Sequence, residues 1–346
     1  HLDCARPTLR TISELSIQRI VLICMLLLAF NVAFYARAHE AHETHDDPVI
    51  NFIQDMVTKH QFSEEKLITL MGNAKKQDGI LNAFDRPATA KPWSFFKKLY
   101  VTDWREKEGV KFWEQHLETL VRAEDEFGIP QEIITALIGI ETNYGTYTGE
   151  FRIVDAFYTL GFYGKRRNKY FLKEFEEFLI LARENNIKPD AIKGSFAGAI
   201  GIAQFMPSSY REYAIDFDGD GKADLENSVV DAIGSASNYL KRHGWKRGEP
   251  IVFPVSAEDA GVLVEMAGKS KPNRTYGELK KAGVQENFEF EDDVSVGLFK
   301  LEGDGGTEFW MSLKNFYVIT RYNPSNNYAL AMVQLSQKIK ALRDAE

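Results

Sequence analysis

Cysteine is nearly missing from this chain of 346 residues, which contains only Cys4 and Cys24. Both lie within the first 38 residues, which we expect to be removed, so the mature chain would hold no cysteine at all. Disulfide stabilisation and thiol catalysis are then excluded. The mature protein must rely on a buried apolar core, and a chain of this length can form one over two or three domains.

A long basic run is also lacking. The formal net charge is −8, with 44% hydrophobic and 27% charged residues, which is typical of a soluble globular protein. Binding to a phosphate backbone requires clustered Lys and Arg, so we expect no nucleic-acid partner. We also expect no organic cofactor and a monomer. Aromatic residues make up 12% of the chain. Their rings stack on sugar faces, although packing in a core is their commoner role.

The N-terminal apolar stretch is too short to be a typical membrane span. It runs over residues 20–34 and is interrupted at Asn31, whereas about 20 apolar residues are needed to cross a bilayer. Three arginines precede it (Arg6, Arg10 and Arg19), and Ala36-Arg37-Ala38 follows it with the small-x-small pattern of a cleavage site. We therefore predict a signal peptide over residues 1–38 and a periplasmic protein. The alternative is an uncleaved signal that anchors the protein in the inner membrane.

The remaining pattern predicts an α+β fold that is mainly α. Apolar residues recur at helical spacing over 48–81, where Ser63 is a candidate N-cap, and over 111–127, which ends at Gly128. A helix over 131–141 is apolar almost all round and should be buried centrally. Further helices are expected at 153–163, 167–184 and 328–342. Short apolar runs at 251–253, 261–264 and 294–301, separated by Gly, Pro, Asp and Asn, predict antiparallel strands.

This pattern divides the mature chain into four parts. They are an N-terminal helical domain over 39–110, a catalytic core over 111–247, a small β subdomain over 248–313 and a C-terminal segment over 314–346. The short tail with His39, His42 and His45 is more typical of a flexible segment than of a metal site.

An acidic residue ends the most apolar helix. Glu141 stands in the segment Gly139-Ile-Glu-Thr-Asn-Tyr-Gly145, just before a polar loop. A carboxyl group held against apolar walls loses solvation of its charged form, so its pKa rises and it can donate a proton near neutral pH. A glycosidic general acid needs this environment. The alternative, of equal weight from this motif alone, is a glutamate that points into solvent.

A segment rich in small residues follows about fifty residues later, over 193–208. Its glycines and alanines allow the backbone to approach a ligand closely, and Ser195 and Gln204 offer hydrogen bonds to a polar substrate. Tight helix packing would explain the small residues, but it would not explain the glutamine.

A third motif, Asp216-Phe-Asp-Gly-Asp-Gly-Lys222, matches the first half of an EF-hand calcium loop. The expected ligands are Asp216, Asp218, Asp220 and the backbone carbonyl of Lys222. Position 12 of the loop is Asn227 instead of the usual glutamate, which leaves the last ligand open, with Glu226 a competitor. The alternative is a solvated acidic turn.

Taken together, these motifs resemble those of the membrane-bound lytic murein transglycosylase B family, within the lysozyme-like lytic transglycosylases. The resemblance runs from about residue 48 to the C-terminus and is weakest over 248–305. It rests on the segments around Glu141 and over 193–208 and on further matches in the same order, among them Arg166-Arg167, Tyr170-Phe171, 231–235, Asn238-Tyr239, 243–245 and 320–323. It implies a lysozyme-like core and cleavage of the bond between N-acetylmuramic acid (NAM) and N-acetylglucosamine (NAG) in peptidoglycan, with a 1,6-anhydro product. Other cell-wall enzymes are conceivable partners.

The resemblance also implies roles for individual residues. Glu141 would act as a lone acid that later serves as base, with no second carboxylate, in contrast to ordinary glycosidases. A later aspartate, Asp231, would close an enlarged structural calcium loop over 216–231. Side chains in several segments would bind the substrate: Ser195, Gln204, Arg166, Arg167, Tyr170, Tyr239, Tyr322 and Asn323. Scaffold packing is the alternative for each of these.

This chain departs from the family at Asn143-Tyr144, where many relatives have Arg-Trp. The aromatic side chain is kept, but a positive charge near the acid is lost. Two other functions stay open from the sequence: a muramidase in which water attacks instead of the 6-hydroxyl group, and a catalytically inactive wall-binding scaffold.

Overall fold

The computed structural model describes residues 47–85 and 91–345, which fall into two compact units that divide after Asn73. The first unit contains α2 (Pro48–His60) and α3 (Glu64–Asn73). Asp47 caps α2 by accepting a hydrogen bond from the amide of Val49, and the Ser63 hydroxyl accepts one from the amide of Lys66. The predicted Ser63 cap is therefore present. The helical pattern predicted over 48–81 covers these two helices and the start of a third, α4 (Asp78–Asp85).

The predicted signal peptide over 1–38 and the tail that follows it lie outside the described residues. Within the described ranges, no helix is both long and apolar enough to cross a membrane.

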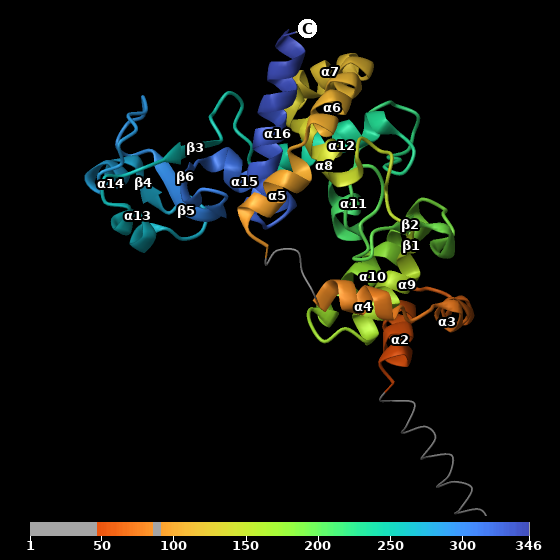
Figure 1. The fold of residues 1–346 in the computed structure, drawn as a ribbon. Coiled ribbons are helices and arrows are strands. Elements are labelled where there is room, and N and C mark those ends of the chain that lie inside the picture. Colours follow the sequence, from red (N-terminus) through yellow and green to blue (C-terminus); the bar gives the residue numbers. More distant parts are fainter. Residues whose placement is uncertain (1–46, 86–90, 346) are drawn as a thin grey trace, which may run out of the picture. The chain divides into compact units, whose positions relative to one another are not determined.

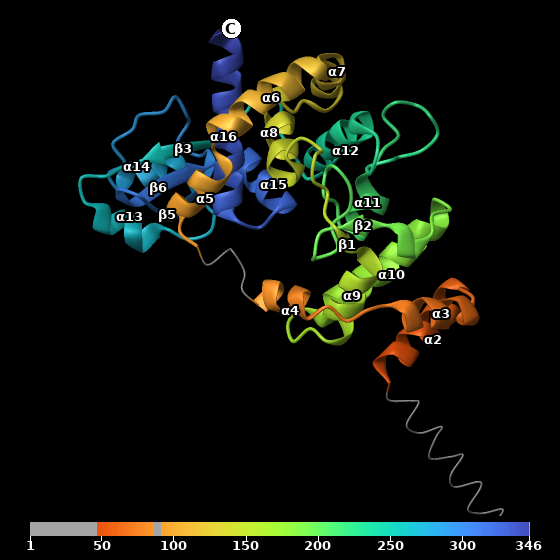
Figure 2. The same cartoon turned by 45° about the vertical axis from the view of Figure 1, so that its right-hand side comes forward.

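The second unit is mainly helical, and its strands are short and antiparallel (Figures 1 and 2). Its helices before residue 250 are α4 (Asp78–Asp85), α5 (Trp93–Tyr100), α6 (Asp103–Gln115), α7 (Leu117–Phe127), α8 (Gln131–Thr142), α9 (Ile153–Phe162), α10 (Asn168–Glu184), α11 (Pro207–Tyr213) and α12 (Val229–Arg242). Strands β1 (Phe151–Arg152) and β2 (Lys193–Gly194) form a two-stranded sheet, and a 3-10 turn precedes β2 at Pro189–Ala191.

Helix α8 is the buried centre of this unit. Every residue from Ile133 to Ile140 is buried, and the helix packs against α6, α7, α12 and α16. Removal of so much apolar surface from water stabilises the arrangement. The predicted central burial is thus confirmed, and the rigid surroundings fix the position of the acidic residue at the end of α8.

One predicted helix is in fact two. The apolar pattern over 111–127 suggested a single element, but α6 begins at Asp103, capped by Thr102, and ends at Gln115. His116 separates it from α7, with ψ at 24° and its ring against Phe112 at a centroid distance of 4.6 Å. Both helices bury apolar residues, so the pattern continues across the break and hides it. Gly128 ends α7 in the left-handed conformation, as predicted.

The four-stranded sheet has the order β3-β6-β5-β4, with β3 (Val252–Val255), β4 (Arg274–Thr275), β5 (Ser295–Gly303) and β6 (Gly306–Ser312). The predicted strands at 251–253 and 294–301 are confirmed. The predicted strand at 261–264 is wrong, because this run lies in α13 (Ala260–Met266), which Asp259 caps. Only Leu263 of this short helix is buried, while Val264 is exposed, so its apolar run does not mark a sheet. Helix α14 (Tyr276–Lys281) completes the subdomain.

The chain ends in two helices, α15 (Lys314–Tyr322) and α16 (Asn326–Ala345). The helix predicted over 328–342 is therefore longer at both ends. Helix α16 packs against α5, α6 and α8, which brings its first turn near the end of α8 (Figure 1). The boundaries proposed at residues 110, 247 and 313 stay predictions.

Candidate active site

Glu141 occupies the last turn of α8 and is half-buried. Its carboxylate accepts a hydrogen bond from the hydroxyl of Tyr328, in the first turn of α16. Two further tyrosines lie near it, Tyr100 at the end of α5 and Tyr322 at the end of α15. Burial raises the pKa of both hydroxyl groups, and the charge of Glu141 raises it further. The carboxyl group therefore faces tyrosines from three other helices.

Burial raises the pKa of Glu141 from 4.5 to about 7, and the hydrogen bond from Tyr328 acts in the opposite direction. Among the described residues, no second carboxylate contributes to this shift. Desolvation is the dominant cause, because the apolar end of α8 and its aromatic neighbours replace water around the charged form. The carboxyl group is therefore suited to gain and lose a proton near neutral pH.

An aromatic cluster continues from Tyr322. Its ring meets Tyr239 edge to face at a centroid distance of 4.9 Å and Phe205 at 5.8 Å. Its hydroxyl donates to the carbonyl of Ala203, and that of Tyr239 donates to the carbonyl of Arg321 at 2.6 Å. These bonds fix both rings, so Tyr322 and Tyr239 form one aromatic cluster that begins beside Glu141.

The loop after Glu141 is tied to the small-residue segment. The side chain of Gln204 donates hydrogen bonds to the carbonyls of Thr148 at 2.9 Å and Gly201 at 2.8 Å. The buried hydroxyl of Thr142 donates to the carbonyl of Ile202 at 2.8 Å. Gln204 thus joins the two loops through its side-chain amide.

The positive charge missing at position 143 is supplied from another helix. The guanidinium of Arg105, on α6, donates to the side chain of Asn143 at 2.9 Å and to the carbonyl of Gly139 at 3.3 Å. It also lies over the ring of Tyr100, 5.4 Å from the centroid. A cation at the C-terminal end of α8 is favourable because the last carbonyls of a helix are partly negative.

Arg105 also supports an unusual backbone. Asn143 and Tyr144 are both in the left-handed region, with φ of 49° and 62°, which is costly for residues other than glycine. The Tyr144 hydroxyl donates to the carbonyl of Arg105 at 2.6 Å, and its ring lies against Gly139, where a Cβ atom would clash. The turn after Glu141 is therefore held by α6.

The other predicted substrate residues make their contacts with neighbours other than Glu141. The hydroxyl of Ser195 accepts hydrogen bonds from the amides of Ala197 and Ala199, which orders its own loop. Arg166 is exposed, and the guanidinium of Arg167 lies 4.2 Å from the ring centroid of Tyr170. Burial raises the pKa of the Tyr239 hydroxyl group, and Tyr170 lies close enough to raise it further. Among the described residues, no hydrogen bond or ion pair joins Ser195, Arg166 or Arg167 to Glu141.

Asn323 follows α15 as its C-cap and is half-buried. Its carbonyl accepts a hydrogen bond from the amide of Ser325 at 2.8 Å, which turns the chain toward α16.

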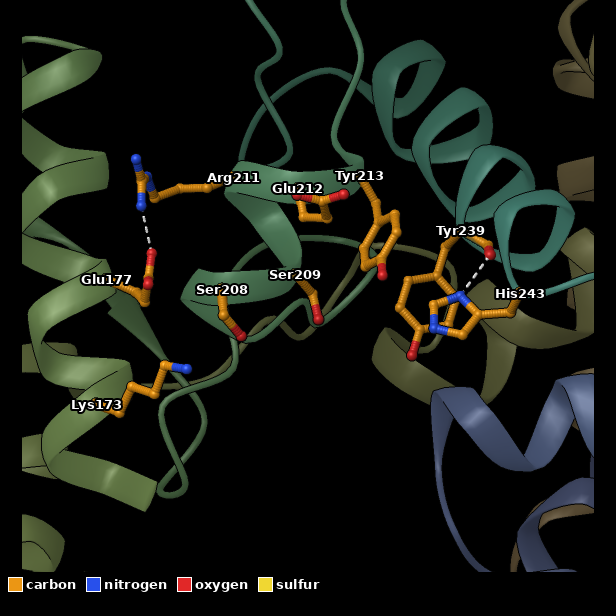
Figure 3. A pocket seen from close by; sticks show the side chains of 9 residues that line it. All are labelled: Lys173, Glu177, Ser208, Ser209, Arg211, Glu212, Tyr213, Tyr239 and His243. Carbon is orange, nitrogen blue, oxygen red and sulfur yellow. Dashed lines mark hydrogen bonds and ion pairs between the residues drawn. The ribbon is translucent and has the colours of Figure 1, made fainter. Parts of the chain in front are cut away.

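Tyr239 also lines a pocket of about 470 Å³ (Figure 3). Its ring stacks on that of His243 at a centroid distance of 4.0 Å, and Tyr213 completes the aromatic wall. The opposite wall is polar: Lys173 and Glu177 come from α10, and Ser208, Ser209, Arg211 and Glu212 come from α11. An aromatic wall that faces polar groups suits a sugar or peptide ligand.

The acidic loop brings three of its predicted ligands together. Carboxylate oxygens of Asp216, Asp218 and Asp231 lie within 4.8 Å of one another, whereas Asp220 is not part of this group. Asn227 donates its side-chain amide to Asp224 instead of facing these oxygens. Three carboxylates are the hard oxygen donors that calcium prefers, so these residues fit the ion.

Asp231 has a second role in the loop. Its side chain is fully buried and accepts hydrogen bonds from the amides of Phe217, Asp218 and Asp224, at 2.7–3.1 Å. The carboxylate thereby links the loop to the first turn of α12.

Sequence reasoning missed Tyr100, Arg105 and Tyr328 as parts of this site. Tyr100 and Arg105 stand in ordinary amphipathic patterns before the catalytic core, where nothing local distinguishes them. Tyr328 had a signal, because it follows Asn323 by only five residues, but the pattern predicts only the start of a helix there.

Comparisons with known proteins identify the family of the chain. The family described as "Transglycosylase SLT domain" matches residues 45–337. Membrane-bound lytic murein transglycosylase B of Escherichia coli K12 is 39% identical over 302 residues, a match that covers 84% of this chain and 82% of that protein.

The similar solved structures are also lytic transglycosylases. Soluble lytic transglycosylase SltB1 of Pseudomonas aeruginosa has a TM-score of 0.80 at 42% identity, covering 86% of this chain and 99% of that one. The E. coli lytic transglycosylase Slt35, in complex with calcium, has a TM-score of 0.78 at 39% identity, covering 86% and 95%. SltB3 of P. aeruginosa, in complex with NAG-NAM-pentapeptide, has a TM-score of 0.74 at 27% identity, covering 84% and 78%.

The fold and the site together define a lytic transglycosylase with a lysozyme-like fold. More particularly, the chain belongs to the SLT-domain family of lytic murein transglycosylases, enzymes that cleave peptidoglycan.

Proposed function

We propose that Glu141 is the single acid and base of this enzyme, and that it cleaves the β-1,4 bond between NAM and NAG to leave a 1,6-anhydro-NAM end. The observation that carries this proposal is the isolated carboxyl group at the end of α8, whose pKa burial raises to about 7. A group of this pKa is protonated often enough to act as acid and deprotonated easily enough to act as base.

The reaction needs no second carboxylate. Protonated Glu141 gives its proton to the glycosidic oxygen, the bond from that oxygen to C1 of NAM breaks, and NAG leaves with a free 4-hydroxyl group. The acetamido carbonyl of NAM assists the positive charge that develops at C1. The Glu141 carboxylate then removes the proton from the NAM 6-hydroxyl group, whose oxygen bonds to C1. Glu141 is protonated again, and no water is consumed.

The tyrosines around Glu141 support both states of the carboxyl group. The hydrogen bond from Tyr328 stabilises the carboxylate that exists between the two proton transfers. Tyr322 and Tyr100 limit access of water and so preserve the raised pKa of Glu141.

Substrate binding follows the surface that leads away from Glu141. In this proposal Gln204, Tyr239, Tyr322 and Asn323 line the sugar subsites, and Ser195 bonds near the carboxyl or acetamido group. Arg166, Arg167 and Tyr170 meet carboxylates on the muropeptide, because guanidinium groups bind planar carboxylates well. The contact of Tyr322 with Tyr239 supports a continuous aromatic floor.

Calcium is proposed as a structural ion of the loop over 216–231. Asp216, Asp218 and Asp231 would hold it, with Asp220 and the carbonyl of Lys222 as further ligands. The ion would add rigidity beside α12, which carries Tyr239. The relative Slt35 was solved in complex with calcium, which supports this assignment.

We further infer that the enzyme acts in the periplasm on peptidoglycan glycan strands after export by the N-terminal segment. The membrane-bound relative in E. coli and the muropeptide complex of SltB3 support this location and this substrate.

The product distinguishes this mechanism from that of a muramidase. Digestion of purified sacculi is expected to release muropeptides that end in 1,6-anhydro-NAM, which are 18 Da lighter than hydrolysis products because no water is added. Mass spectrometry of the soluble fraction measures the ratio of the two. A digest dominated by reducing ends would overturn the transglycosylase mechanism and favour attack by water.

Tyr328→Phe is expected to move the pH profile toward higher pH. The hydrogen bond from Tyr328 lowers the pKa of Glu141, so its loss raises that pKa above about 7. Because the acid acts when protonated, kcat/KM falls as pH rises through this pKa, and the alkaline limb should shift upward by roughly half to one pH unit. The matched control is Tyr163→Phe, an exposed residue at the end of α9, which should leave the limb in place. A limb that stays fixed or moves to lower pH in Tyr328→Phe would refute this role.

A further inference from the structure

A second pocket lies at the junction of the β subdomain and the C-terminal helices. Its volume is about 610 Å³, and it is lined by 268–271, by Leu301 of β5, by the end of α15 and by the chain from Pro324 to Asn327. Helix α15 contacts both β6 and α16, so the walls of this pocket come from packed elements. None of the residues assigned above to catalysis or substrate binding lines it.

The pocket is cationic in an acidic protein. Lys269, Lys271 and Arg321 line it, and no acidic residue is among its lining residues. Lys271, Lys314 and Arg321 also gather around one ring, because their charged groups lie 5.6–5.8 Å from the ring centroid of Tyr317. Within 47–85 and 91–345, no carboxylate forms an ion pair with any of these four cations. Like charges held together without a counter-charge favour an anionic ligand.

The pocket adjoins the active site through the chain itself. Arg321 immediately precedes Tyr322, and its carbonyl accepts the hydroxyl of Tyr239. On the other side, Asn326 and Asn327 line the pocket, and the next residue, Tyr328, donates to Glu141. Residues 321–328 therefore connect the pocket to the proposed sugar subsites.

The remaining lining groups suit a peptide that ends in a carboxylate. Arg321 offers a planar fork for a carboxylate, and Lys269 and Lys271 add positive charge. The hydroxyl groups of Thr320 and Ser325 and the amides of Asn326 and Asn327 offer hydrogen bonds beside it. A bare glycan has few anionic groups, whereas each stem peptide on NAM carries several carboxylates.

We propose that this pocket binds the carboxylates of a peptidoglycan stem peptide, at a site separate from Arg166 and Arg167. This inference rests on the proposed function, because it assigns the pocket to the same polymer that Glu141 cleaves. Binding there makes the enzyme prefer glycan strands that bear peptides over strands from which an amidase has removed them.

The test compares both kinds of strand. For the wild-type enzyme, kcat/KM is expected to be higher on peptide-bearing strands, mainly through a lower KM. In Lys269→Gln, Lys271→Gln the ratio between the two substrates should fall roughly five- to tenfold, as expected for the loss of two partly screened ion pairs. Arg321→Gln should lower the same ratio. The matched control Lys281→Gln, Lys300→Gln removes two exposed charges from the same subdomain outside the pocket and should keep the wild-type ratio.

Three outcomes would overturn the proposal. One is an unchanged ratio in the pocket variants, and another is an equal loss on both substrates, which would indicate a glycan subsite or a folding defect. The third is an unchanged ratio accompanied by loss of binding to phosphatidylglycerol vesicles, which would assign the cations to a lipid surface. Failure of the proposed function is distinct from all three, because the wild-type enzyme would then form no 1,6-anhydro ends on either substrate.

Discussion

Glu141→Gln is expected to lower kcat for release of 1,6-anhydro muropeptides by about 10²- to 10⁴-fold, the usual range for loss of a general acid or base. An amide cannot give a proton to the glycosidic oxygen or remove one from the 6-hydroxyl group, and no second carboxylate is available near it among the described residues. Quantitative mass spectrometry of digested sacculi measures the effect. The matched control is Glu150→Gln, an exposed residue of the following loop, which should keep full activity.

Stability gives an independent check on the same variant. The pKa of Glu141 in the folded state is raised above its ordinary value of 4.5, to about 7, so the folded state favours the protonated form. The contribution of Glu141 to the free energy of unfolding therefore falls as pH rises from 4.5 to about 7. The glutamine variant lacks this penalty, so it should melt at a higher temperature than wild type at pH 8 and at nearly the same temperature at pH 4. Rapid clearing of peptidoglycan by Glu141→Gln would show that Glu141 is not the acid.

Asp231→Ala is expected to destabilise the protein by about 3 kcal/mol or more, even without calcium. The buried carboxylate accepts three backbone amides, and its removal leaves these donors without partners. Each unsatisfied buried group costs about 1–3 kcal/mol. In a protein of this size such a loss lowers Tm by about 5–10 °C. Thermal unfolding in EDTA measures it, and a Tm unchanged from wild type would contradict the structural role of Asp231.

Asp218→Ala, Asp220→Ala separates the ion from the scaffold. These side chains are exposed and bond mainly within their own loop, so the variant should melt near the wild-type temperature in EDTA. Calcium at saturating concentration should raise the Tm of the wild-type protein, because a ligand bound only by the folded state stabilises it. The variant should lose this increase. An equal calcium shift in both proteins would refute the assignment of the loop.

The sequence predicted the parts of this fold and site that local patterns specify. The all-apolar segment before Glu141 identified a buried helix, and Gly128 marked the end of the helix before it. The spacing of Asp216, Asp218 and Asp220 indicated an ion-binding loop, and resemblance added Asp231. Each of these features depends on neighbours within a few turns or on a motif with fixed spacing.

Other features depend on contacts between distant segments, which no local pattern specifies. The group around Glu141 brings together α5, α15 and α16, so Tyr100 and Tyr328 could not be assigned from their own surroundings. The break at His116 was hidden because both helices bury apolar residues on the same core. The run at 261–264 was interpreted as a strand because four residues contain too few turns to separate a helical period from a strand period.

The hydrogen bond between Arg105 and Asn143 has a consequence for sequence change in this family. The guanidinium group of Arg105 bonds to a residue 38 positions later, at the end of α8. We therefore expect that the two positions do not vary independently. An arginine at position 143 would meet Arg105 as a like charge, and Arg105 would lose its hydrogen-bond acceptor there. We therefore expect the two positions to covary: arginine at one should accompany a small polar residue at the other. In this chain, Arg105→Asn combined with Asn143→Arg should be tolerated better than either change alone.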